Sequence, residues 1–179
     1  MEPDIDHILI AQDELQAKVR ELGSRLAEDY AGQTPIFVGV LNGAVMFISD
    51  LARACSIPLS IDFMDVSSYG SGTRTSGVVR ILKDLDRNIE GRHVLIVEDV
   101  VDTGLTLSYL LEQLHARRPA SIKVCALLDK RDRRVSQVQL DYVGFPIPDE
   151  FVVGYGLDFR DLYRNLPYIG VLKPHLYSS

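Results

Sequence analysis

Hydrophobic residues recur at helical spacing in three parts of the chain. In the first part, the apolar positions before Gly32 are Ile8, Leu15, Val19, Leu22 and Leu26. Apolar residues three or four positions apart lie on one face of a helix, and a glycine commonly ends it. A second helix is predicted over Ala44 to Ala54 and a third over Leu105 to Arg117.

Short apolar or alternating runs between these segments predict strands. They cover residues 36–40, 59–63, 78–82, 93–97 and 122–128. Residues 59–63 alternate apolar and polar side chains, as a half-buried strand does. Residues 93–97 (His-Val-Leu-Ile-Val) are almost all apolar, which is typical of a strand buried on both faces of a parallel sheet. Strands that alternate with helices predict an α/β fold with a twisted, mostly parallel sheet.

Two segments follow neither period. Residues 67–77 (Ser-Ser-Tyr-Gly-Ser-Gly-Thr-Arg-Thr-Ser-Gly) are polar and rich in glycine, between two predicted strands. They predict a flexible hairpin flap that closes over a site, with plain disorder as the alternative. From Tyr142 onward, short runs are broken by Gly and Pro, so residues 142–179 are predicted as a small cap. Because the sequence shows no linker or internal repeat, we interpret residues 1–179 as a single domain.

Charge and cysteine content narrow the functional classes. The chain has 179 residues and a formal net charge of −6. An acidic protein is a poor match for nucleic acid, which requires clustered Lys and Arg. Cys55 and Cys125 lie in apolar segments and are expected to be buried thiols. The N-terminus has no signal-peptide pattern, and no apolar run approaches the ~20 residues that cross a bilayer. We therefore expect a cytoplasmic protein without a membrane or nucleic-acid role.

Residues 94–107 contain the acidic and phosphate-binding candidates of the chain. The buried strand ends in Glu98 and Asp99, and Asp102 leads into a Thr-Gly-Leu-Thr turn where the next helix begins. Ligands of open α/β sheets bind at the carboxyl ends of the strands, and a helix start offers amides to an anion. Alternatively, Glu98 and Asp99 are turn residues and Asp102 is a helix cap. Three close carboxylates, however, repel one another unless a cation or ligand hydroxyls offset them.

The sequence lacks the motifs of other phosphate-binding proteins and of hydrolases. The chain lacks G-x-x-x-x-G-K-[ST] and G-x-S-x-G, and Gly154-Tyr155-Gly156 lacks the third glycine of a dinucleotide fingerprint. Asp99 and Asp102 are one residue too far apart for the D-x-D of aspartate-nucleophile phosphatases. The histidines His7, His93, His115 and His175 show no metal-ligand spacing.

The acidic-acidic-x-x-Asp-Thr-Gly segment resembles the signature of type I phosphoribosyltransferases. Val40–Ala44 resembles the pyrophosphate loop of that family, and Ser68-Tyr69 the start of its flap. Residues 128–131 and 148–158 resemble the base-binding region of hypoxanthine(-guanine) phosphoribosyltransferases. The resemblance implies the type I fold with a small hood. It also implies a purine salvage enzyme that transfers the 5-phosphoribosyl group from 5-phosphoribosyl 1-diphosphate to hypoxanthine, and also guanine, giving IMP or GMP and pyrophosphate.

The resemblance also implies roles for individual residues on the sugar-phosphate side. Glu98 and Asp99 would meet the ribose hydroxyls and help place Mg²⁺, and Asp158 would hold a second Mg²⁺. The 5′-phosphate site would be lined by Asp102, Thr103, Gly104, Leu105, Thr106 and Leu107. The pyrophosphate side would be formed by Leu41, Asn42, Gly43 and Arg164. Many relatives carry Lys where this chain has Asn42, so backbone amides are expected to serve there.

On the base side, Asp102 is the implied general base for the purine. Lys130 would donate to the 6-oxo group, Phe151 would stack on the purine, and the Val152 backbone would contact its edge. Ser68 and Tyr69 would belong to the closing flap. For Lys130 and Phe151 the plain alternatives are a solvated turn cation and a core residue.

Three other functions stay open at this point. Some type I family members sense the activated sugar and bind nucleic acid, which Asp102, Lys130 and the net charge of −6 disfavour. The accepting base could instead be xanthine, adenine or a pyrimidine. A sugar-phosphate hydrolase is the weakest alternative, because no water-activating site is evident. Relatives form dimers and tetramers, so the resemblance implies a homo-oligomer.

Overall fold

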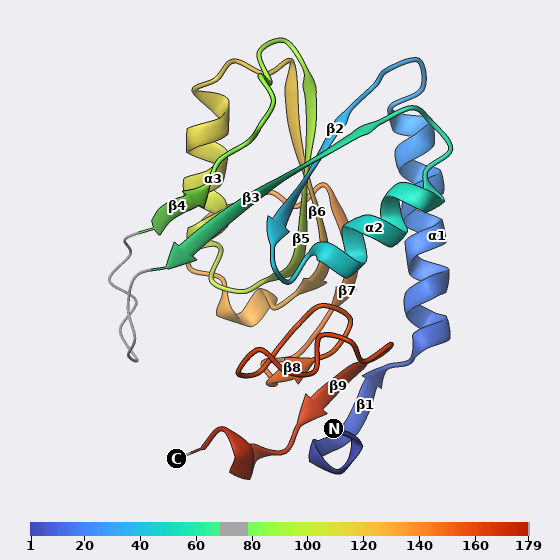
Figure 1. The fold of residues 1–179 in the computed structure, drawn as a ribbon, viewed down its shortest axis with the longest axis vertical. Helices are drawn as coiled ribbons and strands as arrows, with labels where there is room; N and C mark the ends of the chain where they lie inside the picture. Colours follow the sequence, from blue (N-terminus) through green and yellow to red (C-terminus); the bar gives the residue numbers. More distant parts are fainter. Residues whose placement is uncertain (69–78, 179) are drawn as a thin grey trace.

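A six-stranded sheet forms the main body of the protein, with a smaller three-stranded sheet below it (Figure 1). The computed structural model describes residues 1–68 and 79–178. In the large sheet the strand order is β4-β3-β2-β5-β6-β7. Its strands are β2 (Ile36–Leu41), β3 (Ser60–Ser68), β4 (Val79–Lys83), β5 (His93–Val101), β6 (Ser121–Asp129) and β7 (Tyr142–Pro146). All neighbours are parallel except β3 and β4, which pair antiparallel, so the predicted α/β class is confirmed.

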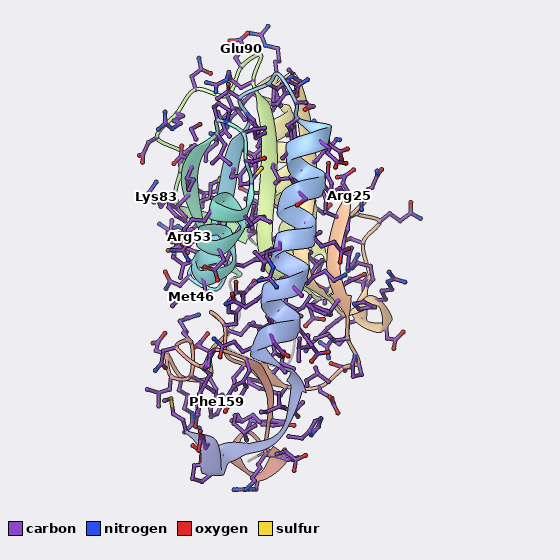
Figure 2. The ribbon with its side chains drawn as sticks, turned by 90° about the vertical axis from the view of Figure 1, so that its right-hand side faces the viewer. Arg25, Met46, Arg53, Lys83, Glu90 and Phe159 are labelled. Carbon is purple, nitrogen blue, oxygen red and sulfur yellow. The ribbon has the colours of Figure 1, made fainter. Side chains whose placement is uncertain are left out.

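Helices cover both faces of this sheet, because the central strands are apolar on both sides. They are α1 (Gln12–Asp29), α2 (Val45–Ala54) and α3 (Leu105–His115). Helices α1 and α2 pack on the face that carries Leu95 and Val97, whereas α3 packs on the face that carries Val94 and Ile96. Figure 2 shows α1 running along the sheet between the end near Phe159 and the end near Glu90. Among the described helices, none has the length and apolar character of a membrane span.

The connections place a topological switch point in the middle of the sheet. Helix α2 leads from β2 to β3 on one side, and α3 leads from β5 to β6 on the other. Strands β2 and β5 are neighbours, so their carboxyl ends diverge into two different loops. Ligands of open α/β sheets bind in the crevice at such a point. The fold thus brings residues 41–43 and residues 98–107 to one edge.

The small sheet, here called the hood, joins the two ends of the chain. Its strands are β1 (Ile5–Ile10), β9 (Ile169–Leu172) and β8 (Val152–Val153), all antiparallel in the order β1-β9-β8. The hood has a small buried cluster of its own, which includes Tyr163, Leu166 and Leu172. Val152 and Val171 belong instead to the cluster beneath α1 and α2, so the hood packs on the main core.

Three sequence predictions about this architecture are wrong. Ile8 does not belong to the first helix: it lies in β1 and is 54% exposed. Residues Tyr142–Pro146 do not belong to the cap, because β7 pairs with β6 in the large sheet. In β3, Asp62 is buried and Ile61 is exposed, the reverse of the expected face. Asp62 can be buried because its Oδ2 accepts the backbone N–H groups of Asp86 and Arg87 at 3.0 and 3.1 Å.

The predicted flap can be compared with the structure only at its base. Strands β3 and β4 pair antiparallel, from Ser68 with Val79 to Asp65 with Lys83, so the predicted hairpin is confirmed up to that point. Tyr69 and the rest of the segment up to Gly77 lie outside the described residues. Both cysteines are free and buried, as expected.

Candidate active site

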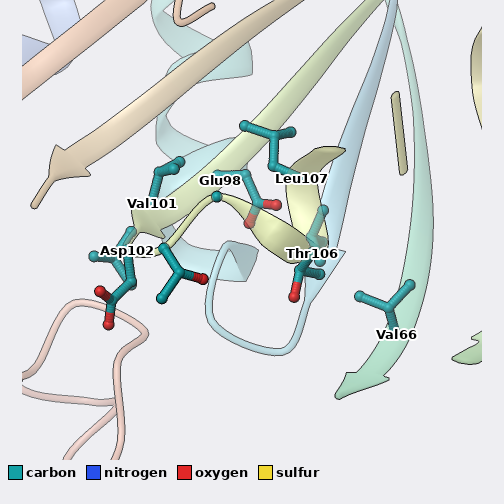
Figure 3. A pocket seen from close by; sticks show the side chains of 10 residues that line it. Val66, Glu98, Val101, Asp102, Thr106 and Leu107 are labelled. Atoms are coloured by element: carbon teal, nitrogen blue, oxygen red, sulfur yellow. The ribbon is translucent and has the colours of Figure 1, made fainter. Parts of the chain in front are cut away.

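The end of β5 and the start of α3 enclose a cavity of about 220 Å³. Its lining includes six of the predicted residues: Glu98, Asp102, Thr103, Gly104, Thr106 and Leu107. Val40 from β2 and Val66 from β3 line the other side; Val40 belongs to the segment that resembles the pyrophosphate loop, whereas Val66 was not predicted from the sequence. Figure 3 shows the Glu98 carboxylate and the Thr106 hydroxyl near the centre of this cavity, with Asp102 at its edge.

The turn before α3 leaves backbone amides free to bind an anion. Gly104 is the N-cap residue and has a φ of 81°, in the left-handed region that glycine adopts without strain. Asp102 is therefore not the helix cap. Within the described residues, the amides of Thr106 and Leu107 have no acceptor, as the first turn of a helix requires. These amides and the helix dipole favour an anion at this place.

Alternation along β5 separates the adjacent carboxylates. Glu98 faces the cavity and is 7% exposed. Asp99 does not line that cavity and lies against the loop after β2, where a Cβ added to Gly43 would be 1.7 Å from Asp99 Oδ2. Any side chain at position 43 would therefore require the Asp99 carboxylate or the loop to move. The proposed trio is thus divided between two sides of one strand end, with Glu98 and Asp102 on one side and Asp99 on the other.

Burial changes the acidity of both carboxylates. Burial, and then the neighbouring Asp99, raise the pKa of Glu98 well above its usual range. Burial also raises the pKa of Asp99 to about 6, although the N–H of Val100 and the cation of Arg164 oppose this. Raised carboxyl pKa values at a cleft are characteristic of functional sites, because a bound cation or ligand is needed to hold the charge.

The predicted pyrophosphate residues lie together around Gly43. The peptide between Leu41 and Asn42 is cis, and Asn42 is exposed. A Cβ added to Gly156 would lie 2.1 Å from the Gly43 carbonyl oxygen, so the hood touches this loop directly. Arg164 donates to the Gly156 carbonyl at 2.8 Å and pairs with Asp158 at 3.0 Å.

On the base side, Lys130 is held near the start of the hood. Its Nζ donates to the Glu150 carbonyl at 2.8 Å, and its side chain is 13% exposed. Phe151 stacks on Tyr177 at 4.7 Å between ring centroids and meets Phe159 edge to face at 5.5 Å. One face of the Phe151 ring is therefore covered by Tyr177. Val152 is buried and pairs with Val171.

Residues 132–136, which the sequence did not single out, contact the turn before α3. Arg134 donates to the Asp102 carbonyl at 3.1 Å and pairs with the buried Asp129 at 2.5 Å. The amides of Val135 and Ser136 donate to the Thr103 carbonyl. Residues 131–136 show no apolar period, so only the tertiary contacts identify this role.

Comparison with known proteins identifies the family. Residues 10–160 match the phosphoribosyl transferase domain. The chain belongs to the phosphoribosyl transferase family. It is 53% identical to the hypoxanthine-guanine phosphoribosyltransferase of Bacillus subtilis, over all of this chain and 99% of that protein. A crystal structure of a hypoxanthine phosphoribosyltransferase from Staphylococcus aureus matches with a TM-score of 0.97 at 50% identity, covering 100% of this chain and 97% of the other.

A second group of relatives is much longer. The chain is 54% identical to the bifunctional protein TilS/HprT of Listeria monocytogenes, over 100% of this chain but only 28% of that protein. The match thus covers one part of a two-function protein there, and nearly a whole protein in Bacillus. In both cases the match includes residues 10–160, the phosphoribosyl transferase segment. The family and the similar crystal structure confirm the type I fold that residues 94–107 predicted.

Across the described residues, no three His, Cys, Asp or Glu side chains gather as a metal cage. Mg²⁺, however, is commonly held by one or two carboxylates together with substrate phosphates and water. Asp99 and Asp158 fit that pattern, since the charge of Asp158 contributes to the raised pKa of Asp99. The donor set therefore suits a divalent cation that arrives with a phosphorylated substrate.

Proposed function

We propose that this chain is a purine salvage enzyme that transfers the 5-phosphoribosyl group from 5-phosphoribosyl 1-diphosphate to hypoxanthine and to guanine. The observation that carries the proposal is the cavity between β5 and α3, in which buried Glu98 and the open amides of Thr106 and Leu107 face one space. The family of the chain and the names of its relatives support the same reaction.

The two sides of the β5 end would bind the two halves of the activated sugar. The amides and hydroxyls of residues 103–107 bind the 5′-phosphate, while Glu98 accepts hydrogen bonds from the ribose hydroxyls. The Gly43 loop, with Arg164 beside it, receives the pyrophosphate. When bound at Asp99 and Asp158, Mg²⁺ would neutralise the charge on the leaving pyrophosphate.

Asp102 would serve as the general base. In the reaction, the bond from ribose C1 to the pyrophosphate oxygen breaks, and purine N9 forms the new bond to C1. The purine then carries a surplus proton on N7, which the Asp102 carboxylate accepts. Asp102 is 42% exposed at the cavity edge, so a purine can reach it.

Lys130 would select 6-oxopurines. Its ammonium has three N–H donors and donates to the Glu150 carbonyl, which leaves donors for a 6-oxo group. The amino group of adenine would instead meet this cation as a second donor. Phe151 can stack on the purine only with the face that Tyr177 does not cover. The homo-oligomer and the cytoplasmic location stay predictions.

Product formation tests the proposal. Purified protein is incubated with the activated sugar and hypoxanthine, guanine, xanthine or adenine, with and without Mg²⁺. IMP and GMP should form only with Mg²⁺, and adenine should react far more slowly. Asp102→Asn should lower turnover by ~10²–10⁴ and leave substrate binding largely intact. Absence of IMP and GMP would contradict the proposed reaction, and normal turnover of Asp102→Asn would remove that residue from it.

A further inference from the structure

A single arginine joins the carboxyl ends of three neighbouring strands beside the cavity. Arg133 ends the short 3-10 helix Arg131–Arg133 that follows β6. Its Nε donates to Asp102 Oδ1 at 2.8 Å, and its Nη1 donates to Asp149 Oδ2 at 3.3 Å. Asp102 follows β5, and Asp149 follows β7. One guanidinium thus links the candidate base to the start of the hood.

This bridge contributes little to the stability of the fold. The side chains of Arg133, Asp102 and Asp149 are 46%, 42% and 50% exposed. Exposed ion pairs contribute little free energy, because water screens them and ordering two long side chains is costly. Their geometry is nevertheless specific, since a guanidinium presents its donors in a rigid plane. The bridge therefore fixes the direction of a carboxylate more than it stabilises the protein.

Only one oxygen of Asp102 is used by this bridge. Within residues 1–68 and 79–178, Asp102 Oδ2 accepts no hydrogen bond, whereas Oδ1 accepts that of Arg133. Without Arg133, a half-exposed Asp102 side chain could rotate among several staggered positions. With Arg133 in place, one oxygen is restrained and the other stays open to a ligand.

Arg133 and its neighbour Arg134 hold different parts of the same residue. Arg134 donates to the main-chain carbonyl of Asp102 and pairs with buried Asp129, so it fixes the backbone of the turn. Among the described residues, Arg133 binds only the carboxylates of Asp102 and Asp149. The side chain and the main chain of Asp102 are therefore held by separate guanidinium groups.

We propose that Arg133 is a positioning residue, which holds Asp102 Oδ1 so that Oδ2 is directed to accept the purine proton, with Asp149 as the anchor of Arg133. This inference rests on the proposed function, since it gives Asp102 its role as the base. It adds a residue that is not among those lining the cavity between β5 and α3. Its effect is expected on turnover rather than on substrate affinity, because the proton is transferred only in the chemical step.

The test compares Arg133→Gln, Arg133→Lys and Asp149→Asn with the wild type, using hypoxanthine and the activated sugar. Arg133→Gln should lower kcat about tenfold and leave both KM values within about twofold, because a misdirected group slows the chemical step. Arg133→Lys, which keeps the charge but not the planar fork, should recover part of this loss. Asp149→Asn should lower kcat by about two- to threefold.

Arg118→Gln is the matched control. Arg118 pairs with Glu90 at 2.9 Å and is 80% exposed. It precedes β6, at the opposite end of that strand from Arg133, so kcat should not change.

A double-mutant cycle separates positioning from a general structural effect. If Arg133 acts through Asp102, Arg133→Gln should have no further effect in the Asp102→Asn protein. The inference is overturned by a kcat of Arg133→Gln within twofold of wild type, by an equal loss in the Asp102→Asn background, or by a raised KM with unchanged kcat. Thermal unfolding shows whether each variant is folded. Because Asp149 also pairs with Lys130 at 3.8 Å, Arg133→Lys, with kcat below that of the wild type and unchanged KM, provides the test should Arg133→Gln fail to fold. An inactive wild type would contradict the proposed function itself.

Discussion

The edge of the large sheet and the hood form opposite sides of the candidate site, and they are built in different ways. Residues 94–107 supply most of the cavity from one continuous strand, turn and helix. The hood instead joins β1 from the N-terminus with β8 and β9 from the last third of the chain. A continuous segment sets its geometry by local rules, whereas a sheet of distant strands depends on the whole fold.

Both regions nevertheless rely on close backbone contacts where they meet. Gly43 lies against Asp99 on one side, and Gly156 of the hood lies against the Gly43 carbonyl on the other. The Gly43 loop is therefore confined between the sheet edge and the hood. Changes there should affect chemistry most, and changes in either core should affect stability.

The largest effect is expected for Gly43→Ala. The new Cβ would lie 1.7 Å from Asp99 Oδ2, so the loop or the carboxylate must move. We expect kcat/KM to fall by at least ~10²-fold, since displaced groups lose their catalytic geometry. Steady-state kinetics with hypoxanthine measure this. Gly32→Ala is the control: its Cβ meets nothing within 4 Å, so activity should persist despite about 1 kcal/mol of strain at positive φ.

The next largest effects are expected when buried leucines in the two cores are replaced by alanine. Leu127→Ala in β6 should lower the free energy of unfolding by about 3–5 kcal/mol, because Leu127 is fully buried under α1 and α2. Leu166→Ala in the smaller hood cluster should lower it by about 2–3 kcal/mol, since fewer groups surround it. Urea unfolding followed by circular dichroism gives both values. Because the hood shares the main core through Val152 and Val171, each variant should unfold in one transition; two transitions would make the hood an independent unit.

A smaller effect is expected for the polar group buried in β3. Asp62→Ala leaves the amides of Asp86 and Arg87 without their acceptor and should destabilise the protein by about 1–3 kcal/mol. Asp86→Ala, at an 80% exposed side chain, should change stability by less than about 0.5 kcal/mol. Equal losses in these two variants would show that burial of Asp62 is not the cause.

The smallest effect is a pH dependence at the sheet edge in protein without ligand or metal. The pKa of Asp99 is raised to about 6, so the folded state binds a proton that the unfolded state releases near pH 4. Stability from this group is present below pH 4 and is lost as pH rises through 6. Relative to Asp99→Asn, the wild type should lose up to ~2 kcal/mol between pH 4 and pH 7, measured by urea unfolding with EDTA.

Asp84 provides a control of opposite sign for that measurement. Arg117 lowers its pKa, so its contribution is present above the unfolded pKa and is lost as pH falls. Relative to Asp84→Asn, the wild type should therefore become less stable towards low pH. The same slope in both comparisons would contradict the assigned pKa directions.

The sequence by itself determined the elements whose burial follows a local period. The apolar run at β5, the spacing of Leu107, Leu110 and Leu114 in α3, and the Thr-Gly turn between them predicted a strand, a helix and an anion site. Each depends on residues close together in the chain, where side-chain direction is set by the backbone period. The same segment also carried the resemblance that led to the family.

Only the tertiary structure decided which distant residues meet. In the folded chain, Ile8 lies in a strand that pairs with β9, and β7 belongs to the large sheet. Asp62 is buried and accepts hydrogen bonds from amides 24 and 25 residues further along the chain. The tertiary structure also divided Asp99 from Glu98 and brought Arg133 to Asp102, 31 residues away in sequence. Pairing and polar satisfaction are properties of the folded chain, because a hydrogen-bond partner or a neighbouring strand can come from any part of the sequence.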